Sequence, residues 1–170
     1  MKMTGKKLGD ELRYGTGNFL CRRRAAASLA AVSMASLGVV ALYQLGIIRR
    51  LPEPVLPGLD AEKVNGSSGA YALLQTPDAV LGLGSYAATL GLASIGGATR
   101  AQTTPWIPLA LAAKAALDAL QAASLTRKSW VRYRAFSLYS LVTALATFLA
   151  LPAVIPEARG AWREITGTSR

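Results

Sequence analysis

The 170-residue sequence contains no histidine and a single cysteine, Cys21. One cysteine excludes any disulfide within the chain. Without histidine or a second thiol, the usual ligand sets for zinc and other transition metals are missing, so we expect no metal site.

Charge is absent from long parts of the chain. Residues 25–48, 79–99 and 135–156 carry no charged side chain, and residues 105–123 carry only Lys114 and Asp118. At about 1.5 Å per residue, each stretch is long enough to cross about 30 Å of hydrocarbon. The alternation of period two that marks a membrane barrel is also absent. We therefore predict an all-α integral membrane four-helix bundle, with spans at about 25–48, 78–99, 105–123 and 135–156.

The net charge of +10 comes from basic residues that lie beside the apolar segments. They do not alternate with aromatics as in a nucleic-acid groove, so we expect no nucleic-acid partner. Seven of them precede the first span: Lys2, Lys6, Lys7, Arg13, Arg22, Arg23 and Arg24. They predict a basic cytoplasmic arm, 1–24, in a bacterial inner membrane. Four crossings then place the tail, 157–170, in the cytoplasm, although the basic loop 124–134 falls outside. The alternative, a twin-arginine export signal, lacks a small-residue cleavage site after its apolar run.

The connection 51–77 would be a long extracytoplasmic loop, which is more often functional than not. Proline followed by an acidic residue suits a helix start, so Pro77 and Asp78 predict where the second span begins. Pro105 marks the start of the third, and we expect the fourth to end at Pro152 to Pro156.

Ser137 and Ser140 stand at the start of the last apolar segment. Two cysteines at this spacing would form a redox dithiol, because the pair can close into a disulfide and a helix N-terminus lowers a thiol pKa. Serine hydroxyls do neither.

Three short motifs follow one another along the predicted topology. They read Ser68-Gly-Ala-Tyr71-Ala72, Thr76-Pro77-Asp78-Ala79-Val80-Leu81-Gly82 and Phe136-Ser137-Leu138-Tyr139-Ser140. Their order resembles the vitamin K epoxide reductase family, over roughly residues 25–156. The resemblance implies a four-helix bundle around a quinone, with a C-x-x-C pair at the extracytoplasmic start of the last helix. It also implies a second cysteine pair in the long loop, which relays electrons to partner proteins.

The chain departs from that family pattern at both cysteine pairs. Residues 60–67 hold no cysteine, and Ser137 and Ser140 occupy the positions of the redox pair. A hydroxyl without a base cannot replace an attacking thiolate. We therefore expect a divergent, redox-inactive member that keeps the scaffold. Quinone is the one cofactor that the resemblance implies, with no flavin or nicotinamide.

Each candidate site residue has two interpretations. Ser137 and Ser140 either donate hydrogen bonds to a quinone oxygen or bond to carbonyls of the preceding turn. By resemblance, four further residues line a quinone pocket: Ser68, Tyr71, Asp78 and Tyr139. Otherwise they serve loop packing, a helix start and an interfacial anchor.

Lys114 and Asp118 lie inside the third span, where a charge costs about 2.5–3.5 kcal/mol, so we expect them to face the bundle interior or another subunit. They form either a proton path or polar ligand wall, or a structural ion pair. Gln44 and Gln121 are candidate partners for them.

Three hypotheses for function stay open. The first is a redox-inactive family member that still binds quinone in addition to membrane lipids. The second is a structural or accessory subunit of a larger membrane protein complex, suggested by small residues on the helix faces. The third is a trapped variant of an active enzyme, in which two cysteines have been exchanged for serine.

Overall fold

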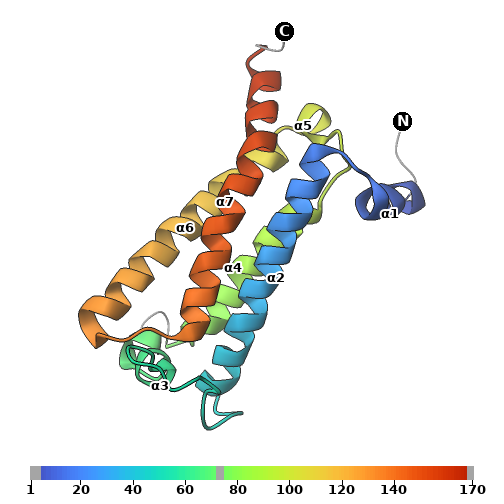
Figure 1. Cartoon of the computed structure of the whole chain (residues 1–170). Helices are drawn as coiled ribbons and strands as arrows, with labels where there is room; N and C mark the ends of the chain where they lie inside the picture. The colour runs from blue at the N-terminus through green and yellow to red at the C-terminus, as the bar shows by residue number, and fades with distance from the viewer. Residues whose placement is uncertain (1–4, 72–74, 168–170) are drawn as a thin grey trace.

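The computed structural model describes residues 5–71 and 75–167, and its regular elements in those ranges are helices (Figure 1). In chain order they are α1 (Gly5–Tyr14), α2 (Asn18–Gln44), α3 (Ala61–Asn65), the 3-10 helix η1 (Ser68–Tyr71), α4 (Asp78–Ser94), α5 (Arg100–Thr103), α6 (Trp106–Tyr133) and α7 (Leu138–Ile165). The all-α prediction is confirmed. Residues 1–4 of the expected arm, Ala72 of the first motif and residues 168–170 of the tail lie outside the described residues.

The four long helices, α2, α4, α6 and α7, run alongside one another (Figure 1). Helix α7 packs against both α2 and α6, and α2 also packs against α4, whereas α4 and α6 contact each other less. The loop with α3 lies at one end of the bundle. Helix α5 and both termini lie at the other end. We call these ends the loop end and the termini end.

The helices pack closely because most of the buried side chains are small. Ala26 and Ala93 meet Ala115 and Val154 in one core cluster, and Ala146 and Ala150 continue the buried face of α7. Small side chains let helix backbones approach, which is how helices associate in membranes. Large apolar side chains face outward instead, including Leu117, 64% exposed, and Leu120, 69% exposed.

The helix starts agree better with the sequence than the helix ends do. Helix α4 begins at Asp78 with Pro77 as its N-cap residue, as predicted. Helix α2, however, begins at Asn18, inside the expected arm, and α1 also lies in that arm. Helix α6 continues to Tyr133, so most of the expected loop 124–134 is helical. That segment contains neither glycine nor proline, and charged side chains do not interrupt a helix. It ends where Arg134 adopts a left-handed conformation, with φ 51°.

Our prediction that the last helix ends at Pro152 to Pro156 is wrong. Helix α7 passes through both prolines and continues to Ile165. A proline removes a backbone donor, but a helix tolerates the loss where neighbouring helices hold it in place. Beyond the prolines, Glu157 and Ala161 are still buried, so packing maintains the helix.

Two helices, Phe19–Gln44 and Leu138–Ile165, are long and apolar enough to cross a membrane. The other two long helices are less favourable by this measure. Helix α4 has 17 residues, and α6 carries Lys114 and Asp118 in its first half.

Candidate functional site

Ser137 immediately precedes α7 and is fully buried, with 0% of its surface exposed. Its Oγ accepts a hydrogen bond of 2.9 Å from Nδ2 of Asn65, the last residue of α3. The same amide nitrogen also donates to the Ala61 carbonyl, at 2.9 Å. Ser137 is therefore bonded to the long loop, and not to the carbonyls of its own preceding turn.

Hydrogen bonds extend from Asn65 across the loop end. Gln44 Nε2 donates to the Asn65 carbonyl at 3.1 Å and to Asp78 Oδ1 at 2.7 Å. Gln44 Oε1 accepts from the Ala79 N–H, and the Tyr71 hydroxyl donates to the Gln44 carbonyl at 3.0 Å. We call Ser137, Asn65, Gln44, Asp78 and Tyr71 the loop-end polar chain. It joins α7, α3, α2, α4 and η1.

Glu53 contributes to this end of the bundle and was not anticipated from the sequence. Its two carboxylate oxygens accept from the Leu138 N–H at the start of α7 and the Ala61 N–H at the start of α3, each at 2.5 Å. Helix N-termini present unsatisfied N–H groups and a partial positive charge, which a carboxylate stabilises. One side chain thus caps two helices. The only signal in the sequence is an acidic residue between two prolines.

Further contacts hold the loop against the start of α7. Backbone bonds of 2.9 Å run from the Asp60 N–H to the Phe136 carbonyl and from the Phe136 N–H to the Gly58 carbonyl. The Tyr139 hydroxyl donates to the Pro52 carbonyl at 2.5 Å. The loop therefore covers the segment that contains Ser137.

Three of the predicted quinone-site residues, Ser68, Tyr139 and Ser140, are not part of the loop-end polar chain. Ser68 is exposed, and its neighbour Ser67 accepts the hydrogen bond from the Tyr133 hydroxyl, at 2.8 Å. Ser140 is half-buried, and within residues 5–71 and 75–167 its hydroxyl has no hydrogen-bond partner. The structure thus joins Ser137, Tyr71 and Asp78 in one chain of hydrogen bonds, and leaves Ser68, Tyr139 and Ser140 outside it.

Lys114 and Asp118 form a second polar cluster, between α6 and α4. Lys114 Nζ lies 2.5 Å from one Asp118 carboxylate oxygen and 2.6 Å from the other. Ser85 and Thr89 of α4 donate to the two oxygens at 3.2 and 3.0 Å, and Lys114 donates to Ser85 at 2.8 Å. Both oxygens of the Asp118 carboxylate are therefore hydrogen-bonded.

Within the described residues, the two glutamines named as candidate partners of Lys114 and Asp118 form no hydrogen bond with them. Gln44 belongs to the loop-end polar chain, and Gln121 is exposed. The hydroxyls of Ser85 and Thr89 on α4 are the hydrogen-bond partners instead. These two residues are four positions apart, which places both on the same face of the helix.

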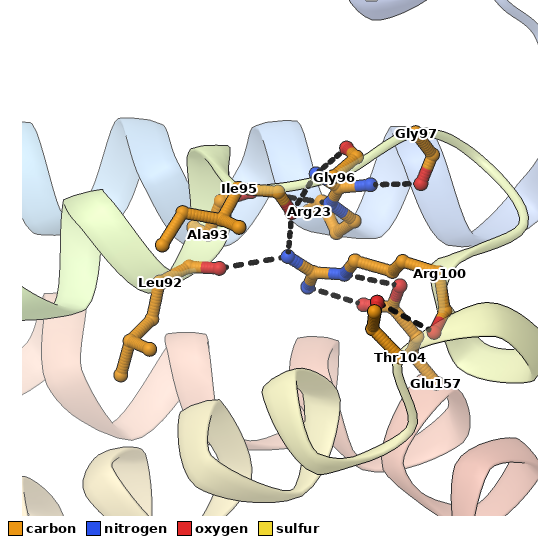
Figure 2. Close-up of polar contacts among 9 residues, drawn as sticks. All are labelled: Arg23, Leu92, Ala93, Ile95, Gly96, Gly97, Arg100, Thr104 and Glu157. Carbon is orange, nitrogen blue, oxygen red and sulfur yellow. Dashed lines mark hydrogen bonds and ion pairs between the residues drawn. The ribbon is translucent and has the colours of Figure 1, made fainter. Parts of the chain in front are cut away.

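The termini end contains a third polar cluster, shown in Figure 2. Arg100 donates from Nε and one terminal nitrogen to the two oxygens of Glu157, at 2.8 and 2.7 Å. Both side chains are buried, with 0% and 2% exposed. The remaining nitrogen of Arg100 bonds the carbonyls of Leu92 and Ile95, each at 2.7 Å.

Arg23 lies beside this pair and is also buried. Its guanidinium donates to four carbonyls at the end of α4 and in the following turn: Ala93, Ile95, Gly96 and Gly97. We call Arg23, Arg100 and Glu157 the arginine cluster. In the sequence Arg23 is one of three consecutive arginines, and nothing there separates it from its neighbours as a buried residue.

The described residues hold no group of three or more potential metal ligands. Cys21 is exposed in the first turns of α2, near the termini end. At 1.5 Å per residue, α2 separates it by about 35 Å from Gln44 and the loop-end polar chain.

These features define a class of protein: a helical bundle in which a long loop covers the start of the last helix. A family model for the vitamin K epoxide reductase family matches residues 24–155. The chain belongs to the vitamin K epoxide reductase family, and this membership together with two apolar helices indicates an integral membrane protein. Among curated proteins, none matches the chain.

Proposed function

We propose that this chain is a four-span family member that does not carry out thiol–disulfide exchange. The observation that carries the proposal is Ser137. At the redox position of the family stands a buried hydroxyl that accepts a hydrogen bond from an amide and, in the described part of the chain, is not hydrogen-bonded to any carboxylate or other base. A hydroxyl in this setting has neither the acidity nor the electron chemistry of a thiol.

The pattern of exposure supports four spans. Leucines of α6 that would contact lipid are exposed, whereas Lys114 and Asp118 of the same helix turn toward α4. A water-soluble bundle would expose the polar side and bury the leucines. This inverted pattern favours a lipid environment for α6 as well as for α2 and α7.

A thiol-dependent quinone reduction assay tests the proposal. In an active family member, a dithiol substrate is oxidised to its disulfide, and a quinone takes up the two electrons and two protons to become the quinol. We expect the purified chain to show no turnover above the rate without protein. Turnover that disappears when the chain is omitted would disprove the proposal.

The double variant Ser137→Cys, Ser140→Cys separates the first and third hypotheses. If the chain is a trapped form of an active enzyme, this variant should reduce quinone with a dithiol substrate. If the chain is instead a redox-inactive family member, the variant should stay inactive, because the long loop also lacks the cysteine pair that relays electrons. Reading codons 137 and 140 in the gene decides directly whether the serines are natural.

We also propose that quinone binding, where it persists, uses the hydroxyls of Ser137 and Ser140. The donors of Asn65, Gln44 and Tyr71 are already engaged in the loop-end polar chain. Ser137 accepts through its oxygen and retains its own proton for donation. Chromatography of lipids extracted from the detergent-purified protein tests this. If the extract contains no quinone and added quinone shows no saturable binding, the chain has no quinone site and this proposal is wrong.

A role as an accessory subunit is the second candidate, and one feature of α4 favours it. Apart from the backbone of α4 itself, no atom of the described residues lies within 4 Å of the position that a Cβ would take at Gly84 or at Gly91. A helix of another subunit would be able to approach this face closely. Mild solubilisation and co-purification test this role. A monomer that remains stable alone would count against it.

A further inference from the structure

A groove opens between α6 and α7 toward the termini end, with a volume of about 310 Å³. Four apolar residues line one part of it: Leu109, Ala112, Ile155 and Ala158. The last turns of α7 complete the lining with two arginines and a tryptophan, Arg159, Trp162 and Arg163. The surface of the groove is thus mostly apolar, and Arg159 and Arg163 form its cationic part.

The length of α7 places the cationic part of the groove at the membrane surface. Its 28 residues extend about 42 Å, whereas the hydrocarbon core is about 30 Å thick. Because the helix begins at the loop end, its final turns lie beyond the hydrocarbon, in the headgroup region. Trp106 at the start of α6 and Trp162 are both exposed near this level, as interfacial aromatics are. This placement rests on the proposed membrane topology and does not depend on the redox state.

In the described part of the chain, neither arginine of the groove, Arg159 or Arg163, forms an ion pair. Glu157 is turned inward, with both oxygens bonded to Arg100. Glu164 adjoins Arg163 in sequence, but consecutive residues on a helix point in different directions. Arg159 and Arg163 are four residues apart and therefore present two guanidinium groups on one face.

We propose that this groove binds an anionic phospholipid of the cytoplasmic leaflet. One acyl chain lies along the apolar residues, and the phosphate accepts hydrogen bonds from Arg159 and Arg163. Guanidinium groups bind phosphate oxygens in a bidentate manner, and basic pockets between membrane helices on the cytoplasmic side suit such headgroups. A zwitterionic lipid also carries a positive ammonium group, which the two arginines repel, so we expect such a lipid to bind more weakly.

Native mass spectrometry of the full chain in detergent tests the proposal, with phosphatidylglycerol and phosphatidylcholine as probes. We expect phosphatidylglycerol to bind at least tenfold more tightly than phosphatidylcholine. The double variant Arg159→Gln, Arg163→Gln should remove this preference. The matched control, Arg127→Gln with Lys128→Gln, loses two exposed charges from the other end of α6 and should keep it. Equal binding of the two lipids, or an equal loss in the control, would overturn the proposal.

A substitution in the apolar part of the groove tests the position of the acyl chain. Ala112→Phe fills the groove and leaves both arginines, so binding of phosphatidylglycerol should weaken at least fivefold. Ala113→Phe, on the adjacent exposed position outside the groove, should leave binding unchanged. If inorganic phosphate competes fully with the lipid, or Ala112→Phe binds as the parent does, the site is an anion site without a lipid and the proposal fails. If Ala112→Phe does not fold, the arginine variant still decides.

Discussion

The carboxylate of Glu157 is the counter-charge of a guanidinium that has no contact with solvent. Glu157→Ala should lower the free energy of unfolding by about 3–5 kcal/mol, because it leaves the Arg100 charge buried and unpaired. Unfolding followed by circular dichroism in detergent measures this. Glu164→Ala, an exposed glutamate on the same helix, should change stability by less than about 0.5 kcal/mol. Equal losses in the two variants would show that the arginine cluster does not stabilise the bundle.

Lys114 neutralises a carboxylate that would otherwise stand within the bundle between α4 and α6. Lys114→Met should lower stability by about 3 kcal/mol, since Asp118 would keep only the Ser85 and Thr89 hydroxyls as donors. The double variant Lys114→Met, Asp118→Leu should recover most of this loss, because it removes both charges together. Unfolding measurements on the parent, the two single variants Lys114→Met and Asp118→Leu, and the double variant give the coupling energy between Lys114 and Asp118. A double variant no more stable than Lys114→Met would contradict an ion-pair role.

The resemblance to the vitamin K epoxide reductase family was enough to single out Ser137, Tyr71 and Asp78 as candidates, and the structure links these three. The residues between them were not predictable. Asn65 reaches Ser137 across 72 positions of the sequence, and Glu53 reaches Leu138 across 85. A local pattern contains no information about such contacts, because the path of the loop decides which polar group meets which helix end.

At the scale of elements, Glu53 connects the long loop to α3 and α7. Glu53→Gln replaces a charged acceptor of two helix N-termini by a neutral amide, which weakens both caps by about 0.5–1 kcal/mol each. We expect the amide protons of Ala61 and Leu138 to exchange several-fold faster, as measured by hydrogen exchange with mass spectrometry.

Glu62→Gln is the matched control for this prediction. Glu62 lies in the same loop, and in the described part of the chain its carboxylate accepts only the Leu51 N–H, at 3.3 Å. The exchange of Leu138 should not change in this variant. If both variants accelerate exchange at Leu138, the effect comes from loop charge in general, and not from the cap that Glu53 provides.

The starts of α4 and α6 were predictable from local chemistry, and the helix ends were not. Pro77 with Asp78 and Pro105 mark starts because proline suits the first turn and lacks the N–H that a start leaves unused. The prolines at 152 and 156 give a stop signal by the same local rules, yet α7 continues because Glu157 and Ala161 are buried against other elements. Packing of the whole bundle overrides the local preference there.

At the scale of the whole molecule, the arrangement of the two ends follows from four antiparallel long helices. The loop end contains Glu53 and the loop-end polar chain, and the termini end contains the arginine cluster and the proposed lipid groove. Basic residues gather in α1 and in the second turn of α2, which favours a cytoplasmic termini end. The orientation therefore decides which compartment each site faces.

The single cysteine of the chain allows that orientation to be measured. Cys21 is exposed, so a membrane-impermeant maleimide should label it in inverted vesicles or opened cells but not in intact cells. The matched variant combines Cys21→Ser with Val55→Cys, which moves the thiol to a fully exposed position in the long loop. It should be labelled in intact cells, because the loop lies on the other side of the membrane under the proposed four-span topology. Labelling of Cys21 from outside would reverse the topology, place Ser137 on the cytoplasmic side, and move the groove with Arg159 and Arg163 to the outer leaflet.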